Sequence, residues 1–334
     1  MQSIEAMEKE IGYQVEDLQC LELPSQRNID DCFITGSGDS YVASLFANYI
    51  SNFKLKCCHP MDIVLSPSLV KNRSVYLVSV SGSTSATIRA AKRAKKFGSR
   101  TTAITANIQS HLARSCDDLI TIKYRSTHTP TSGTVGFLAS LLCCLSLICR
   151  LDYLKISKRI FDESISAVAK LTNYNITRSS SNLFLGNGIQ FPAAIYGSLK
   201  LNEVFGVRSF SYSLDEFCHA PIFSLKRNDR IIVLGHDAKE EHTTKKMNDI
   251  LAKFGVFVFY LDCAKPTLFE SLLKSIFCLQ LYASRAAVKN RLKDCYFLRN
   301  RKLLALSSGL IYERRLGLKH SRSISNNRNI LSIY

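Results

Sequence analysis

The chain contains 334 residues, of which 46% are hydrophobic and 21% charged, so it has enough apolar material for a large core and a length typical of about two domains. Residues 1–5 lack the basic stretch and apolar run of a signal peptide, and the longest apolar run, Val135 to Cys149, is shorter than the roughly 20 residues that span a bilayer. We therefore expect a globular, cytoplasmic protein with no membrane partner.

The formal charge of +17 is concentrated at the C-terminus. From Arg285 to Tyr334 there are 12 Lys or Arg residues against two acids, Asp294 and Glu313, a net charge of +10. The remainder is only mildly basic, which suits a protein that handles anionic metabolites. The tail leaves three explanations open: a surface for nucleic acid or membranes, a lineage-specific extension, or a shifted reading frame. We favour the last two, because the change to basic sequence is abrupt.

The 12 cysteines do not form a metal-binding or disulfide pattern. Two pairs are adjacent in the sequence, Cys57 with Cys58 and Cys143 with Cys144, and no C-x-x-C occurs. Buried free cysteine behaves as a small hydrophobe, so we expect most of these residues to be reduced core thiols and expect no metal site.

The first half of the chain alternates strands with helices. Its strands are rich in apolar and β-branched residues, and glycines mark the turns. The predicted strands are 32–35, 75–80, 101–105 and 119–122, and the predicted helices are 40–51, 85–97, 110–114 and a long apolar helix from Thr134. Such βαβ repetition predicts a parallel sheet flanked by helices.

The second half repeats this plan, with a strand at 183–185, a helix ending at Phe205, and strands at 231–234 and 256–261. Residues 33–38 and 183–188 share an apolar strand followed by Gly-x-Gly, which indicates an internal duplication. Neither turn completes the G-x-G-x-x-G of dinucleotide-binding proteins, because Tyr41 and Phe191 stand where the third glycine would be.

A loop rich in hydroxyl side chains follows the strand 75–80. Its residues are Ser79, Ser81, Gly82, Ser83 and Thr84. In an open parallel sheet, ligands bind at the carboxyl ends of the strands, and the amides at the start of the next helix favour an anion. The sequence therefore predicts a phosphate-binding loop, although the same residue types are equally typical of a helix N-cap.

Residues 78–87 resemble the S-x-S-G-x-T loop of the sugar isomerase (SIS) domain family. Residues 38–41, which include Ser40, resemble the family's first loop, where G-T-S-Y is common. Residues 131–134, with Ser132 and Thr134, resemble its third, sugar-binding segment. The second half, at 184–192, 197–203 and 216–221, is similar to the isomerase domain of glucosamine-6-phosphate synthases.

This resemblance implies an α/β protein with two tandem SIS domains, each a flavodoxin-like three-layer α/β/α sandwich around a five-stranded parallel sheet. The expected parts are an N-terminal helix 1–23, a first SIS domain 24–150, a linker helix 151–181, a second SIS domain 182–300 and a basic tail 301–334 of uncertain order. Dimers of the family place the histidine of one subunit near the other's site, so a homodimer is also implied.

The resemblance assigns catalytic roles to three residues. Glu203 matches the carboxylate that moves hydrogen between C1 and C2 of the sugar, and His219 matches the histidine that opens the ring. Lys200, on the same helical face as Glu203, matches the lysine that assists this transfer or steadies the enediolate. Glu216 is a weaker candidate that orients His219 or belongs to its loop. Taken singly, such a Lys-Glu pair is typical of a solvated helix face.

Three features depart from the synthases. Gln2 follows the initiator methionine where the synthases have the cysteine of a glutaminase domain, so we expect glutamine not to be the nitrogen donor. Val80 and Ser83 replace residues that are commonly Gln and Glu. The family's C-terminal lysine, which forms an imine with the sugar, has only a faint counterpart, for which Lys302 and then Lys293 are candidates.

The resemblance therefore implies a phosphosugar-metabolising enzyme of the glucosamine-6-phosphate deaminase/isomerase type, which forms fructose 6-phosphate and ammonia without a cofactor. Two alternatives stay open: a glucose/mannose-6-phosphate isomerase, and a non-catalytic sugar-phosphate-binding protein like those in transcription regulators. Residues 1–30 are too short and acidic for a helix-turn-helix domain, and the tail lacks the apolar periodicity of a folded reader, so we expect no nucleic-acid partner.

Overall fold

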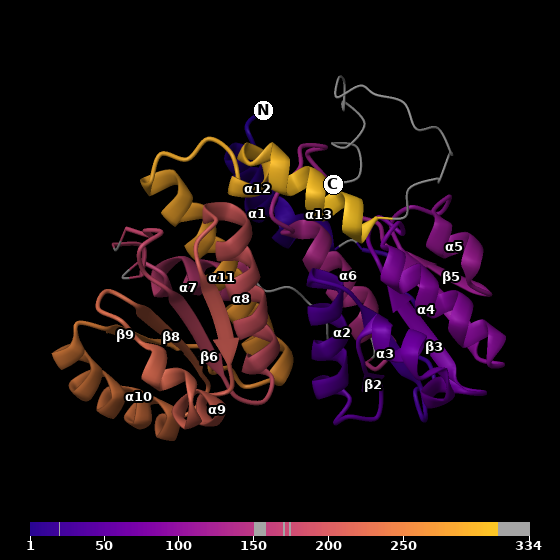
Figure 1. Cartoon of the computed structure of the whole chain (residues 1–334), viewed down its shortest axis with the longest axis horizontal. Helices are drawn as coiled ribbons and strands as arrows, with labels where there is room; N and C mark the ends of the chain where they lie inside the picture. Colours follow the sequence, from indigo (N-terminus) through magenta and orange to yellow (C-terminus); the bar gives the residue numbers. More distant parts are fainter. Residues whose placement is uncertain (20, 150–157, 170, 174, 313–334) are drawn as a thin grey trace.

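The computed structural model describes residues 1–19, 21–149, 158–169, 171–173 and 175–312. In this part of the chain, strands and helices build two separate parallel sheets with helices on both faces of each (Figure 1). The expected linker and basic tail are described only in part, because 150–157 and 313–334 lie outside the described residues.

The first sheet has the five parallel strands expected from the sequence, in the order β2-β1-β3-β4-β5. This is the flavodoxin-like order, in which the chain reverses direction across the sheet between β1 and β3. The strands are β1 (Phe33–Gly36), β2 (Lys56–Cys57), β3 (Ser74–Val78), β4 (Arg100–Thr105) and β5 (Asp118–Thr121). We call the unit from β1 to α6 the first lobe.

The second sheet repeats this order with four strands, β7-β6-β8-β9, and not the five expected. The strands are β6 (Asn182–Gly186), β7 (Ser209–Tyr212), β8 (Arg230–Gly235) and β9 (Phe257–Asp262). Only residues 263–266 separate β9 from Thr267, the N-cap of α11, which is too short for another helix and strand. We call the unit from β6 to α11 the second lobe.

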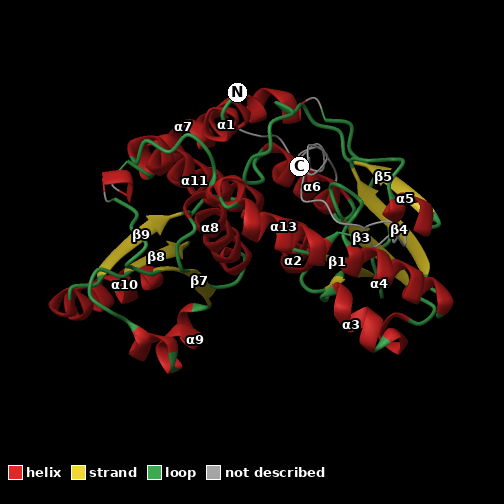
Figure 2. Ribbon diagram, turned by 45° about the horizontal axis from the view of Figure 1, so that its top comes forward, coloured by secondary structure: helices red, strands yellow, loops and turns green. Residues whose placement is uncertain are grey.

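The helices pack on both faces of the sheets, and Figure 2 shows α2, α6, α8 and α11 between the two sheets. The helices are α1 (Ser3–Gln19), α2 (Asp39–Ile50), α3 (Pro60–Leu65), α4 (Ser85–Lys96), α5 (His111–Ser115), α6 (Val135–Ser146), α7 (Lys158–Ala167), α8 (Gln190–Phe205), α9 (Leu214–His219), α10 (Ala238–Leu251), α11 (Leu268–Lys289), α12 (Tyr296–Arg299) and α13 (Arg301–Ile311). None of the helices in the described ranges is long and apolar enough to cross a membrane.

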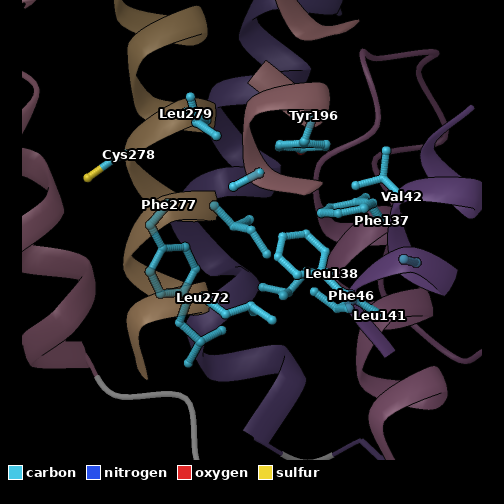
Figure 3. Close-up of a cluster of buried hydrophobic side chains, with 14 of the residues drawn as sticks. Val42, Phe46, Phe137, Leu138, Leu141, Tyr196, Leu272, Phe277, Cys278 and Leu279 are labelled. Atoms are coloured by element: carbon cyan, nitrogen blue, oxygen red, sulfur yellow. The ribbon is translucent and has the colours of Figure 1, made fainter. Parts of the chain in front are cut away.

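The two lobes share one central apolar core. Side chains alternate between the two faces of each strand, so Phe33 and Leu183 point to the outer layers while Ile34 and Phe184 point to the centre. The central side chains include Phe46 from α2, Phe137 from α6 and Tyr196 from α8, and Figure 3 shows them meeting residues of α11. The rings of Phe137 and Tyr196 are stacked with centroids 4.1 Å apart, across the boundary between the lobes.

The cysteines that the structure describes are free thiols, and several of them lie in the core as predicted. Within the expected basic tail, whose order the sequence leaves uncertain, Arg301–Ile311 forms α13. The Asn300 side chain accepts a hydrogen bond from the Leu303 amide and caps this helix.

Two matching turns set the start of a helix against the end of a strand in each lobe. A side chain on Gly36 would meet the Ser40 backbone at 2.7 Å, and one on Gly186 would meet the Gln190 carbonyl at 2.5 Å. Only glycine permits this approach, which explains the repeated Gly-x-Gly of the sequence. The first of these turns brings the N-terminus of α2 to the end of β1.

Gly206 ends α8 in the left-handed conformation, with φ 64°, and a Cβ there would lie 2.2 Å from the ring of Tyr296. We expect Gly206→Ala to lower the free energy of unfolding by about 2 kcal/mol or more, because the backbone is strained and α12 is displaced. Gly309→Ala is the matched control, because Gly309 lies in α13 with no atom near a Cβ; it should be neutral or stabilising by up to about 1 kcal/mol. Thermal and urea unfolding of both variants test this, and equal stability changes would contradict it.

Candidate active site

Lys200 is a fully buried cation held between two carboxylates. It lies near the end of α8, and its Nζ donates to Asp39 Oδ2 at 2.9 Å and to Glu203 Oε2 at 2.8 Å. Asp39 is the first residue of α2, so the ion pair joins the start of α2 in the first lobe to the end of α8 in the second. Because the Lys200 side chain is wholly buried, the interpretation of Lys200 and Glu203 as a solvated helix pair is wrong.

The charges of this cluster perturb one another. Burial disfavours the Lys200 ammonium, but the negative charges of Asp39 and Glu203 outweigh burial and hold the pKa of Lys200 above its usual value. Burial raises the pKa of Asp39 to about 6, against the lowering effect of Lys200. Its Oδ1 atom is buried and has no partner among the described residues. The two carboxylates therefore favour the charged form of Lys200, whereas burial disfavours the charged form of Asp39.

Glu203 is oriented through one of its two carboxylate oxygens. Oε2 accepts from Lys200 and from the Ser132 hydroxyl, which lies 2.5 Å away. Oε1 makes no hydrogen bond with any residue that the structure describes, and 40% of the side chain is exposed. The carboxylate thus has one fixed oxygen and one open oxygen, which suits a base that must reach a bound substrate.

The segment that carries Ser132 lies tightly against this cluster. Gly133 has φ 31°, and a Cβ there would be 2.0 Å from Asp39 Oδ2 and 3.1 Å from Lys200 Nζ. Its carbonyl accepts from the Tyr196 hydroxyl at 2.7 Å. Thr134, predicted as a ligand contact, is 1% exposed and donates its hydroxyl to Glu10 at 2.7 Å. In this structure the Thr134 hydroxyl therefore anchors its own loop to Glu10 of α1.

The serine loop follows β3, at the same edge of the sheet as Asp39. Strands β1 and β3 are paired, with Gly36 opposite Val78, so the loops at 37–40 and 79–84 are neighbours. Ser40 lies in the first of these loops at the start of α2 and is 9% exposed. The edge therefore gathers hydroxyl groups beside the carboxylates.

The hydroxyls of the serine loop bond mainly with one another. Ser79 and Thr84 share a hydrogen bond of 3.1 Å, and Ser81 and Ser83 share one of 2.8 Å. Thr84 is the N-cap residue of α4, but its side chain makes no capping bond with the first turn. Gly82 has φ 62° and approaches Ser110 so closely that a Cβ would lie 2.1 Å from its Oγ. Because Thr84 makes no capping bond, the first-turn amides of α4 have no side-chain cap and can donate to an anion.

His219 and Glu216 lie far from Glu203 within one chain. Helix α9 follows β7 directly, so both residues lie at the carboxyl edge of the second sheet. Glu203 lies about 20 Å along α8 from Gln190, at about 1.5 Å per residue, and therefore near the opposite edge. The His219 side chain is 71% exposed, and its Nε2 lies 3.7 Å from Asp215 Oδ2. The chain brings Ser132, Lys200 and Glu203 together but leaves His219 apart from them.

The C-terminal candidates lie on the segment that passes the end of α8. Lys302 is exposed in the first turn of α13 and has no ion-pair partner in the ranges that the structure covers. Cys295, just before α12, is buried close to the cluster; burial raises the pKa of its thiol to about 11, and the charge of Glu203 adds to this. Beyond α13, Tyr312 forms an isolated antiparallel bridge with Thr84 of the serine loop.

Sequence reasoning missed Asp39, Glu10 and Tyr196. Asp39 carried a signal, because it stands where the resembling family commonly has threonine. A lysine on an otherwise apolar helix also indicates a buried carboxylate partner, although not which one. Among the described residues no cluster of His, Cys, Asp and Glu is arranged to hold a metal ion.

Residues 26–149 match the family model of the SIS domain. A glutamine–fructose-6-phosphate aminotransferase (isomerizing) from Mesorhizobium japonicum is 24% identical over 255 residues, which are 69% of this chain and 42% of the relative. The chain thus spans about two fifths of the length of that curated relative.

Solved structures share the fold at low sequence identity. A glucosamine-6-phosphate deaminase from Thermotoga maritima superposes with a TM-score of 0.65 at 20% identity, covering 86% of this chain and 96% of that one. The C-terminal domain of a glucosamine-fructose-6-phosphate aminotransferase from Francisella tularensis gives 0.67 at 19% identity, covering 86% and 98%. The α/β fold is thus shared with these solved structures, and residues 26–149 match the family model of the SIS domain.

Proposed function

We propose that this chain is a phosphosugar-metabolising enzyme of the glucosamine-6-phosphate deaminase/isomerase type, built from two tandem SIS domains. The observation that carries the proposal is the placement of Glu203 and Lys200 against Asp39 and Ser132, at the sheet edge that also bears the serine loop. A base, a fixed cation and an anion site at one edge are the groups that an aldose-ketose interconversion needs.

The serine loop would bind the phosphate. Ser79, Ser81, Ser83 and Thr84 supply hydroxyl donors, and the first-turn amides of α4 add the positive end of a helix dipole. On binding, the hydroxyls would exchange their bonds with one another for bonds to phosphate oxygens. Ser40 and Ser132 lie on the adjacent loops; Ser40 would be the nearer to a bound sugar, whereas the buried Ser132 hydroxyl is donated to Glu203.

Glu203 would move the proton between C2 and C1. Its open Oε1 takes the C2 proton of the open-chain amino sugar, and the resulting enolamine receives the proton at C1. The product is an imine at C2, which water hydrolyses to fructose 6-phosphate and ammonia. Lys200, held as a cation by its two carboxylates, stabilises the negative charge that develops on O1.

The same groups support simple isomerisation of a hexose 6-phosphate, and one observation favours this second candidate. A lysine must be uncharged to form an imine, yet Lys200 is ion-paired with a raised pKa. Lys302 would have to serve instead, and it is exposed on α13. The route through Glu203 given above needs no lysine imine, whereas a route through a lysine imine would depend on Lys302; if ammonia is not released, a glucose/mannose-6-phosphate isomerase is the alternative.

His219 would open the sugar ring from a second subunit. Its position at the opposite edge of the lobe separates it from Glu203 of its own chain, whereas a two-fold homodimer can bring the exposed imidazole of one subunit to the site of the other. Glu216, exposed in the first turn of α9, would accompany it.

The direct test is to incubate the purified chain with glucosamine 6-phosphate and to measure ammonia and fructose 6-phosphate, with glucose 6-phosphate and mannose 6-phosphate in parallel. Glu203→Gln should lower kcat by about a thousandfold, because the base is lost while its size is kept. The control is Glu241→Gln on α10, where Glu241 pairs with the exposed Lys245; this variant should match wild type. Binding of these sugars without turnover by the wild type would refute the enzymatic proposal.

The phosphate role of the serine loop predicts a change in KM. Ser81→Ala should raise KM for the sugar phosphate by about tenfold with kcat changed less than about threefold, because one hydrogen bond to a charged group is lost in both ground and transition states. Ser68→Ala, at an exposed serine between α3 and β3, should leave both constants unchanged. A fall in kcat at unchanged KM would contradict phosphate binding by Ser81.

The proposed sharing of His219 predicts complementation. Glu203→Gln and His219→Asn should each be inactive alone, yet their mixture after subunit exchange should recover about a quarter of the wild-type activity. Half of the dimers are then mixed, and each mixed dimer has one site with both native residues. If His219 served its own chain, every site would lack one residue and the mixture would stay inactive.

A further inference from the structure

The N-terminal helix α1 places a buried carboxylate on the loop that carries Ser132. Glu10 is 3% exposed, and the loop 127–134 lies more than a hundred residues away in the sequence. We propose that Glu10 is a positioning residue, which fixes this loop and thereby sets the orientation of Glu203 through Ser132. This inference rests on the proposed function of Glu203.

Both oxygens of Glu10 are fully used by the loop. Oε1 accepts from the Thr127 amide at 3.2 Å and from the Thr127 hydroxyl at 2.8 Å. Oε2 accepts from the hydroxyls of Thr131 at 3.0 Å and Thr134 at 2.7 Å. The four donors come from both ends of the loop, so one carboxylate closes it into a fixed shape.

The cost of burying a carboxylate indicates that this arrangement is specific. Glu10 has no ion-pair partner within the part of the chain that the structure describes, so only these neutral donors offset its desolvation. An apolar residue would fill the same space at lower cost if packing were the only role. The carboxylate instead provides directional acceptors for three threonine hydroxyls.

A second set of bonds holds the loop from the other side. The Tyr196 hydroxyl donates to the Gly133 carbonyl, and the Gln280 amide donates to the Thr134 carbonyl at 3.3 Å and to Tyr196. Gln14, one turn after Glu10 on α1, donates to Gln280 at 2.6 Å. Helix α1 therefore binds the threonine side chains of the loop directly through Glu10. It contacts the loop carbonyls indirectly, because Gln14 bonds to Gln280.

Ser132 lies between the residues that these two sets of bonds fix. Its hydroxyl is directed at Glu203 Oε2, and it is 1% exposed. A displacement of about 1 Å in a catalytic group can cost about a hundredfold in rate. Loss of the Glu10 bonds would release Thr131 and Thr134 on either side of Ser132 and let Glu203 turn.

The test compares Glu10→Gln with Glu5→Gln, the same change on an exposed residue of the same helix. We expect Glu10→Gln to lower kcat by about 10- to 100-fold with KM for the sugar phosphate within about threefold, because the serine loop is untouched. Glu5→Gln should match wild type. Thr131→Val removes one donor from the loop side and should lower kcat in the same direction by a smaller factor.

Coupling separates positioning from a general loss of stability. In a double-mutant cycle, Glu10→Gln should have little further effect on kcat when Ser132→Ala is already present, whereas independent effects would multiply. Multiplicative effects, or a loss confined to KM, would overturn the proposal.

Hydrogen exchange of the peptide 125–134 distinguishes failure of this inference from failure of the proposed function. Exchange should be faster in folded Glu10→Gln than in Glu5→Gln, whether or not the wild type turns over a sugar phosphate. If the wild type is inactive, the proposed function falls. If exchange is also unchanged, the positioning role falls with it.

Discussion

The burial of the Lys200 ammonium constrains the relation between the two lobes. A buried cation without a partner costs several kcal/mol, so Asp39 and Glu203 must both reach it. Glu203 is on the same helix, but Asp39 comes from the other lobe, at the first residue of α2. The start of α2 must therefore meet the end of α8. This requirement brings the carboxyl edge of the first sheet, with the serine loop and Ser132, to the helix that carries the candidate base.

Much of the fold follows from local patterns in the sequence. The buried strands β3 and β8 are apolar runs bounded by turn residues, and the repeated Gly-x-Gly marks the beginnings of both lobes. The pattern fails where an element is short or partly exposed, as with the two-residue β2 and with β7. The number of strands in the second sheet was also not predictable from the local pattern. The chain passes directly from β9 to α11, and no sequence feature there marks the absence of a fifth strand.

The candidate site could be predicted only in part for the same reason. Lys200 and Glu203 are one helical turn apart, so their contact follows from helix geometry. Lys200 pairs with Asp39, and Glu10 with Thr134, across more than a hundred residues of sequence. Such contacts depend on tertiary packing, and the local hydrophobic pattern of the sequence does not reveal them. Thr134 shows the consequence: its residue type fits a ligand contact, but its hydroxyl serves the framework. His219 lies apart from this cluster within one chain, and its proposed role depends on an assembly of subunits that a single chain does not show.

The central core described above has a consequence for how such a chain arises. The helices α2 and α6 of one lobe and α8 and α11 of the other bury apolar side chains in one shared core (Figure 3). A solitary lobe with such a face would expose it to water, and a second copy of itself is the surface that covers it most simply. The boundary between the lobes thus has the apolar character of an obligate subunit interface, although it lies within one chain. The two lobes nevertheless differ in what they contribute: one has five strands and the serine loop, and the other has four strands and carries Lys200 and Glu203.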